Sequence, residues 1–218
     1  MARGVEHPGR VLILNGGSSA GKTTLGRALQ SAMPGPWLLL GIDLLIWTLP
    51  PEMINHPDGL SVHEGVITRG ELFTPLYEGF QYAVAALGRS GVDVLVDDLT
   101  LDGLVDQQRW NHALQGLDVC WIGVRCAPQI ATDRESRRGT RLPGIARYQA
   151  YSVHAGVHYD VEVDTGVLDL NEELSVIAEA LWQRWSLLVA TESSPKAALP
   201  PTSAWMPEGV VRPAPWES

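Results

Sequence analysis

One short segment near the start of the chain combines the residue types that bind a chain of phosphates. Residues 16–23 read GGSSAGKT and satisfy the pattern G-x-x-x-x-G-K-[ST]. Glycines let successive backbone N–H groups turn toward an anion, an ammonium group can contact the outer phosphates, and a threonine hydroxyl can ligate Mg²⁺. The segment predicts binding of ATP and Mg²⁺, and the candidate ligands are Gly16, Gly17, Ser18, Ser19, Ala20, Gly21, Lys22, Thr23 and Thr24.

Lysine is rare in this chain, and this restricts the class of nucleotide-binding protein. Lys22 and Lys196 are the only two lysines. A GTPase recognises guanine with an N-K-x-D segment, and between Lys22 and the C-terminal tail no lysine can supply one. The GTPase class is therefore close to excluded. A glycine-rich turn with an accidental lysine is the alternative, but the motif lies between an apolar run and an amphipathic stretch, where a phosphate loop belongs.

Three aspartates follow apolar runs that are typical of buried strands. Asp43 ends WLLLGID, and Asp97 and Asp98 end VLVDD. The carboxyl ends of parallel strands form the ligand-binding edge of a sheet, where a carboxylate can accept a hydroxyl proton or hold Mg²⁺. Asp43 is a candidate base and acceptor contact, with a helix N-cap for residues 44–48 as the alternative. Thr23 and Asp97 are the candidate metal ligands, and Asp97 and Asp98 are both candidate acceptor contacts, or caps of the following turn; the sequence leaves their division of roles open.

Arginines cluster in the segment RESRRGTR, residues 134–141. Planar guanidinium groups stabilise the charge that spreads over the oxygens of a phosphoryl group in transfer, and Gly139 permits a hinge. Arg138 and Arg141 are therefore candidate catalytic residues, and Arg134 is a candidate contact of the adenine. The alternative is a solvated basic helix face. Trp47, shortly after Asp43, is the tryptophan that we expect near an aromatic substrate, with a core or helix-face position as its alternative.

The elements that position these residues alternate between short apolar runs and amphipathic stretches. This alternation is typical of an α/β fold in which helices sandwich a parallel sheet. We expect five strands, at residues 11–15, 37–43, 92–96, 118–124 and 159–163. We expect helices at residues 22–33, 71–88, 104–114, 130–137, 143–153 and 172–188. Residues 50–70 lack a clear period and are predicted to be a long loop or small insertion near the site.

The organisation that we predict is one P-loop kinase-like domain at residues 10–190, with a lid at about 134–147. Residues 1–9 form an N-terminal extension. Residues 191–218 hold six prolines, a composition that predicts a disordered tail.

Charge and composition restrict the partners. The formal net charge of −9 disfavours nucleic acid and anionic membranes, which leaves a small-molecule substrate as the expected partner. The chain has no apolar run of the ~20 residues that cross a bilayer, and its N-terminal apolar run is too short for a signal peptide. Cys120 and Cys126 both fall in the strand-like run DVCWIGVRC, where an extended chain holds them too far apart to form a disulfide. We therefore expect a cytoplasmic protein, and its oligomeric state stays open.

Seven separate segments, in order along the chain, resemble the chloramphenicol phosphotransferase family: LILNGGSSAGKT, PWLLLGIDLLI, VLVDDL, QQRW, LDVCWIGVRC, RESRRGTR and VHYDVEVDT. The likeness covers about residues 10–165 and continues more loosely through the last helix. It implies a P-loop kinase-like fold and transfer of the ATP γ-phosphate to a hydroxyl of the antibiotic, which inactivates it and confers resistance. In this resemblance Asp43 matches the catalytic base, and Arg138 and Arg141 match the lid arginines.

Three segments depart from the family pattern: the first nine residues, residues 50–70 and the proline-rich tail. The second of these is expected to shape the acceptor pocket, so the acceptor stays open. A kinase of another natural product or metabolite, or a nucleotide-binding module without an acceptor, are the alternatives.

Overall fold

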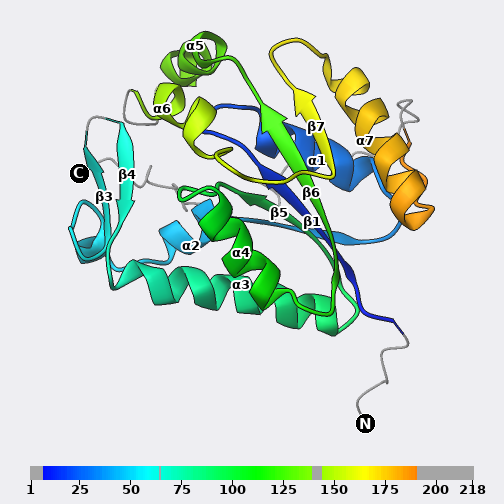
Figure 1. Cartoon of the computed structure of the whole chain (residues 1–218), viewed down its shortest axis with the longest axis horizontal. Helices are drawn as coiled ribbons and strands as arrows, with labels where there is room; N and C mark the ends of the chain where they lie inside the picture. The colour runs from blue at the N-terminus through cyan, green and yellow to red at the C-terminus, as the bar shows by residue number, and fades with distance from the viewer. Residues whose placement is uncertain (1–6, 64, 139–143, 191–218) are drawn as a thin grey trace, which may run out of the picture.

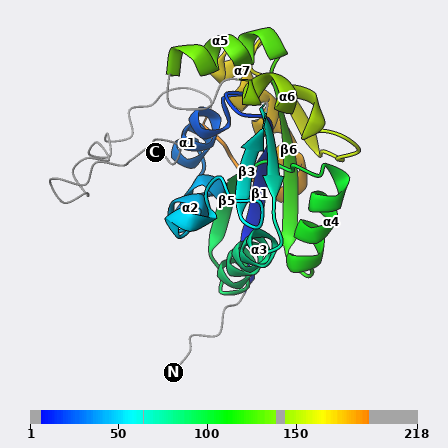
Figure 2. The ribbon, with the colours of Figure 1, turned by 90° about the vertical axis from the view of Figure 1, so that its left-hand side faces the viewer.

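The fold is built on a five-stranded parallel sheet with helices on both of its faces (Figures 1 and 2). The computed structural model describes residues 7–63, 65–138 and 144–190, and for Arg138 its backbone only. The strands are β1 (Arg10–Asn15), β2 (Trp37–Gly41), β5 (Asp93–Asp98), β6 (Asp118–Arg125) and β7 (Val161–Asp164). Their order in the sheet is β2-β5-β1-β6-β7, and every neighbouring pair is parallel. The predicted fold class is confirmed.

The central strand β1 separates two hydrophobic cores because its side chains alternate between the two faces of the sheet. Leu12 and Leu14 face a core that includes α1 (Lys22–Ala32) and α7 (Leu170–Trp185). Val11 and Ile13 face a core that includes α3 (Phe73–Arg89) and α4 (Leu104–Ala113). All four side chains are fully buried. A strand buried on both faces is apolar at every position, which explains the run VLIL.

Two further helices, α5 (Pro128–Arg138) and α6 (Ile145–Ser152), lie side by side at the end of the sheet where β1 finishes (Figure 1). Ala131 of α5 and Ala146 of α6 belong to the same core as α1 and α7. Residues 139–143 between them, the middle of the predicted lid, lie outside the described residues, as do residues 1–6 and the predicted tail.

The second strand is shorter than predicted. It ends at Gly41, and α2 (Ile42–Trp47) starts at once, with Gly41 in an extended conformation as its N-cap. Asp43 therefore lies in the first turn of a helix; it neither ends a strand nor caps the helix. The chain turns here because Ile42, Leu45 and Ile46 pack with Phe73 and Tyr77 of α3 in a third apolar cluster.

Residues 50–70 contain ordered structure that the sequence pattern did not reveal. A short 3₁₀ helix, η1 (Pro51–Met53), precedes an antiparallel hairpin of β3 (Leu60–His63) and β4 (Val66–Arg69). Strands of four residues are too short to give a clear alternation, and the prolines and glycines around them are equally typical of the long loop or small insertion that we predict. The hairpin is held on the molecule by Leu60 and Ile67, which pack with α3.

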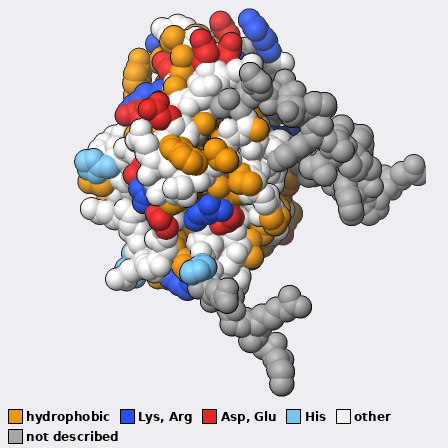
Figure 3. All heavy atoms as spheres, turned by 90° about the vertical axis from the view of Figure 1, so that its right-hand side faces the viewer, with side chains coloured by type: hydrophobic (Ala, Val, Ile, Leu, Met, Phe, Trp, Pro, Cys, Tyr) orange, Lys and Arg blue, Asp and Glu red, His pale blue; other side chains and the backbone are white. Residues whose placement is uncertain are grey.

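The face that carries α7 mixes acidic, basic and apolar side chains (Figure 3). On α7, Arg184 pairs with Asp118 at 2.8 Å and with Asp160 at 2.9 Å. Within the described ranges, no helix combines the length and the apolar character that crossing a membrane requires. Cys120 and Cys126 are buried free thiols, in agreement with the predicted lack of a disulfide, and burial raises the pKa of Cys120 to about 12.

Candidate active site

The motif at residues 16–21 forms the loop between β1 and α1. Gly21 has a φ of 96°, a left-handed conformation that favours glycine, and the same region is used by Ser19 at 59°. Gly16 passes so close to β6 that a Cβ on it would lie 2.3 Å from the carbonyl oxygen of Val124. The loop ends at the N-terminus of α1, whose first turn holds no acidic residue. This geometry suits an anion, because the N–H groups and the helix dipole both present positive charge.

The Lys22 ammonium group and the Thr23 hydroxyl lie beside the carboxyl end of β5. Lys22 Nζ donates to the carbonyl oxygens of Gly16 at 2.8 Å and Gly17 at 3.0 Å, and it lies 3.8 Å from Asp97 Oδ1. Thr23 Oγ1 donates to Asp97 Oδ2 at 2.5 Å. Sheet pairing of β1 with β5 places Asp97 opposite Leu14, so the carboxylate reaches the loop that follows β1. The structure thus brings together three of the predicted residues.

The pair of Thr23 and Asp97 fits a magnesium ion. A hydroxyl and a carboxylate oxygen within hydrogen-bond distance are hard ligands, and Mg²⁺ usually takes one or two protein oxygens and completes its shell with water and phosphate. Among the described residues there is no cluster of three or more His, Cys, Asp or Glu side chains that could hold a metal by themselves.

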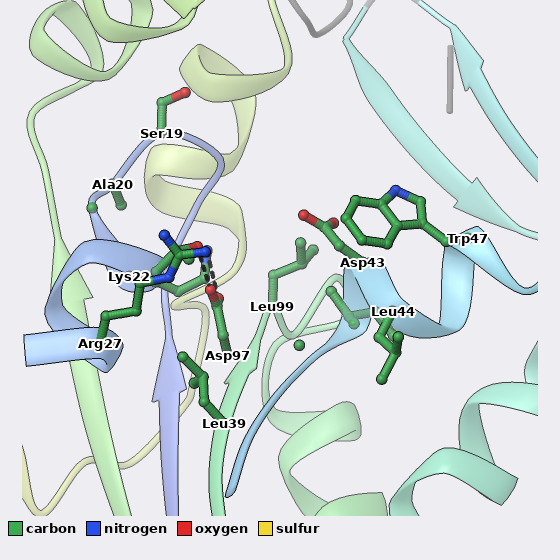
Figure 4. Close-up of a pocket in the computed structure, with 14 residues that line it drawn as sticks. Ser19, Ala20, Lys22, Arg27, Leu39, Asp43, Leu44, Trp47, Asp97 and Leu99 are labelled. Carbon is green, nitrogen blue, oxygen red and sulfur yellow. Dashed lines mark hydrogen bonds and ion pairs between the residues drawn. The ribbon is translucent and has the colours of Figure 1, made fainter. Parts of the chain in front are cut away.

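In front of this loop is a pocket of about 410 Å³. One side of it is polar and consists of the phosphate loop, Asp97 and Arg27 (Figure 4). The other side is mostly apolar and comes from β2, α2 and the end of β5. It is lined by Leu39, Gly41, Ile42, Asp43, Leu44, Trp47 and Leu99. Asp43 is the charged side chain on this second side.

Asp43 and Trp47 are one helical turn apart on α2 and lie side by side facing the pocket (Figure 4). Figure 4 shows the Asp43 carboxylate directed toward the space in front of the phosphate loop. Trp47 is 42% exposed and is therefore available to a ligand. The Asp43 carboxylate and the Trp47 ring thus lie beside the phosphate loop, where the sequence predicted them; their roles stay predictions.

Asp98 does not reach the pocket, which corrects its predicted role as an acceptor contact. Successive side chains on a strand point to opposite faces, so Asp98 turns away from Asp97. Its carboxylate is fully buried, and Oδ2 accepts hydrogen bonds from the Tyr77 hydroxyl and from Trp110 Nε1, both at 2.6 Å. Burial raises the pKa of Asp98 to about 6, although the hydrogen bonds from Tyr77, Leu99 and Trp110 oppose the shift.

The predicted nucleotide ligands fall into two groups. Ser19, Ala20, Gly21, Lys22 and Thr23 line the pocket. Gly16, Gly17 and Ser18 lie at the back of the loop against β6 and α6, and Thr24 is exposed in the first turn of α1. The Arg138 side chain and Arg141 lie outside the described residues.

Arg134 contacts the phosphate loop indirectly. Its guanidinium group donates to Thr165 Oγ1 at 2.9 Å and to the Thr165 carbonyl at 2.7 Å. Thr165 Oγ1 in turn donates to the carbonyl oxygen of Ala20 at 2.7 Å. The contact of Arg134 with an adenine stays a prediction.

Sequence reasoning missed Thr165, Gln149 and Arg27. Gln149 Oε1 accepts a hydrogen bond from the Ser18 N–H group at 2.9 Å, but nothing in a helix sequence identifies such a partner more than 100 residues away. Arg27 had a usable signal, because a residue four positions after Thr23 lies on the same face of a helix.

Known proteins resemble this chain in sequence and in fold. Residues 9–182 match the family described as "Chloramphenicol phosphotransferase-like protein". "Putative O-phosphotransferase Rv2636" of Mycobacterium tuberculosis is 34% identical over 184 residues, which cover 75% of this chain and 78% of that protein.

Solved structures of other proteins share the fold at low sequence identity. The tunicamycin resistance protein of Deinococcus radiodurans has a TM-score of 0.57 at 15% identity, covering 84% of this chain and 98% of its own. The APS kinase CysC of Mycobacterium tuberculosis, solved with AMPPNP and APS, has a TM-score of 0.56 at 15% identity, covering 81% of this chain and 99% of its own. The fold is that of P-loop kinases. The chain belongs to the chloramphenicol phosphotransferase-like family and is a phosphotransferase.

Proposed function

We propose that this protein transfers the γ-phosphate of ATP to a hydroxyl group of chloramphenicol or a similar small antibiotic alcohol, with Mg²⁺, and so confers resistance. One observation carries the proposal: a single pocket has a phosphate loop on one side and the Asp43 carboxylate on the other. Asp43 lies on the mostly apolar side of the pocket and faces the phosphate loop. A protein that only binds or senses a nucleotide has no need of a carboxylate in this position.

In the proposed reaction Asp43 acts as the general base. Its carboxylate accepts the proton of the acceptor hydroxyl as the oxygen forms a bond to the γ-phosphorus. The bond from that phosphorus to the β–γ bridging oxygen breaks, and ADP leaves. Lys22 and the N–H groups of the loop stabilise the negative charge on the transferred group. Thr23 and Asp97 would hold Mg²⁺, which supplies further neutralisation of phosphate charge.

The apolar side of the pocket supports an acceptor with an aromatic or other apolar part. Ile42 and Leu99 line both the pocket and a neighbouring apolar hollow of about 30 Å³ between α2, α3 and the hairpin. Two polar groups beside the hollow are engaged elsewhere: the Tyr77 hydroxyl bonds to Asp98, and Arg69 bonds to Asp106 at 2.7 Å. Apolar contact contributes about 25 cal/mol per Å² buried, so Trp47 and these walls favour an apolar acceptor over a free sugar.

The test is acceptor-dependent turnover. Purified protein with ATP and Mg²⁺ is expected to release ADP when chloramphenicol is added, and mass spectrometry of the drug should find one added phosphate, located by fragmentation. No turnover with chloramphenicol but turnover with another alcohol in a metabolite panel would make the protein a kinase of that acceptor. Nucleotide binding without turnover on any acceptor would contradict phosphate transfer.

A further inference from the structure

Helix α6 packs directly against the back of the phosphate loop (Figure 4). Gln149, in the middle of this helix, is 1% exposed, and its Oε1 accepts a hydrogen bond from the Ser18 N–H group at 2.9 Å. The backbones also approach closely here, since a Cβ on Gly17 would lie 3.0 Å from the carbonyl carbon of Gln149. The loop is therefore supported by α6 just before Ser19, where the chain enters its left-handed turn.

The helix that carries Gln149 is itself fixed. Glu135 of α5 is buried, and its two carboxylate oxygens accept the backbone N–H groups of Gly144 and Ala146, each at 2.9 Å. The first N–H groups of a helix have no acceptor within that helix, and Glu135 supplies acceptors for two of them at the start of α6. Ile145 and Ala146 are buried. Gln149 thus presents its oxygen from a helix that is hydrogen-bonded to α5 and packed into the core.

The geometry assigns Gln149 the role of a positioning residue that sets the shape of the phosphate loop for nucleotide binding. It acts on the loop backbone and lies outside the pocket lining. Its other polar atom, Nε2, is buried with no hydrogen-bond partner among the described residues. Among the described residues, Oε1 is therefore the side-chain atom through which Gln149 bonds to the loop. This inference rests on nucleotide binding by the loop, a part of the proposed function.

Gln149→Met tests it, because methionine has a similar size and lacks the accepting oxygen. Loss of a partner for a buried N–H group is expected to weaken ATP binding roughly tenfold, as measured by titration calorimetry with Mg²⁺. The turnover rate at saturating ATP should change by less than about threefold, because the groups that contact the reacting atoms are unchanged.

Gln107→Met is the matched control. Gln107 is 3% exposed and lies on α4. Its Oε1 accepts a hydrogen bond from the His158 N–H group at 2.9 Å, as Gln149 Oε1 does from Ser18, and its Nε2 donates to the His158 carbonyl oxygen at 2.6 Å. Neither residue lines the pocket. Both substitutions should lower the melting temperature, and only Gln149→Met should weaken ATP binding. Equal ATP affinity in the two variants would overturn the inference.

Hydrogen exchange in the wild-type protein gives a second test that needs no variant. The Ser18 amide is expected to exchange slowly in NMR spectra without nucleotide, and rapid exchange at this amide would overturn the inference even if Gln149→Met does not fold. Wild-type ATP binding is measured first. Its absence would contradict the proposed function, whereas the Ser18 exchange rate would still report whether Gln149 holds the loop.

Discussion

Two neighbouring aspartates have different environments because side chains alternate along a strand. Asp97 lies on the pocket face of β5, where it accepts a hydrogen bond from the Thr23 hydroxyl. Asp98 lies on the other face, where it accepts hydrogen bonds from Tyr77 and Trp110. The sequence DD carries no sign of this division. Alternation implies that the two side chains point to opposite faces of the sheet. Which of them faces the pocket depends on the side of the sheet that carries the phosphate loop and α1.

Asp43→Asn tests the proposed base. The amide keeps the size of the side chain but cannot accept the hydroxyl proton, so kcat should fall by about 10²-fold or more. The KM for ATP should stay near the wild-type value. Steady-state kinetics with Asp58→Asn as control should show no change, because this side chain is 61% exposed and lies between η1 and β3, outside the pocket lining. An unaltered kcat in Asp43→Asn would remove Asp43 from the mechanism.

Lys22→Ala tests the phosphate loop. Removal of the ammonium group that bridges the loop carbonyls and faces Asp97 should abolish turnover. Far-UV circular dichroism should stay native, because the surrounding core residues are unchanged. A rate close to wild type would show that the phosphates bind elsewhere.

At the scale of elements, long regular segments were predictable and short or composite ones were not. The five strands and the long helices have several turns or a full apolar run to reveal their period. The boundary between β2 and α2 was misplaced by two residues, because WLLLGIDLLI is apolar on both sides of Gly41. The strands of the β3–β4 hairpin, with four residues each, are too short to show a period in the sequence.

The residues of the site also divide into those that a local sequence pattern predicts and those that it does not. The phosphate loop and Asp43 could be located from local sequence, since the loop has its own motif and Asp43 closely follows the apolar run of β2. The supports of the loop, Gln149 and Thr165, come from distant elements that the fold brings together. A single sequence does not encode such pairs in any local pattern.

Helix α2 should determine acceptor affinity through Trp47. Trp47→Ala is expected to raise the KM for the acceptor roughly tenfold and to leave the KM for ATP unchanged, because the ring borders the acceptor side of the pocket. Trp182→Ala is the control, since this tryptophan on α7 is 53% exposed and remote from the pocket lining. A similar acceptor KM in both variants would argue against an aromatic contact.

At the scale of the whole molecule, buried polar groups join elements across one face of the sheet. Trp110 of α4 and Tyr77 of α3 both donate to Asp98 of β5, and the two rings meet edge to face. These contacts fix both helices relative to the strand that supplies Asp97. Burial also raises the free energy of the charged form of Asp98, because the carboxylate is removed from water.

This cost predicts a pH dependence of stability. The pKa of Asp98 is raised from 3.8 to about 6 by burial, so the folded state binds its proton more tightly than the unfolded state. The resulting stabilisation is complete below pH 3.8 and is lost as the pH rises through about 6. In urea unfolding, the stability of the wild type relative to Asp98→Asn should decline between pH 4 and 7 by a few kcal/mol, in order of magnitude.

Asp133→Asn, at an exposed position of α5, should instead follow the wild type across this range. If the difference between the wild type and Asp98→Asn does not vary with pH, Asp98 does not titrate in this interval.

A crystal structure with a non-hydrolysable ATP analogue, Mg²⁺ and chloramphenicol tests the central claim most directly. The analogue's β- and γ-phosphates should lie against the backbone of residues 16–23, with a drug hydroxyl within hydrogen-bond distance of the Asp43 carboxylate and in line with the γ-phosphorus. Nucleotide bound away from this loop, or a drug whose hydroxyls face away from Asp43, would contradict the account.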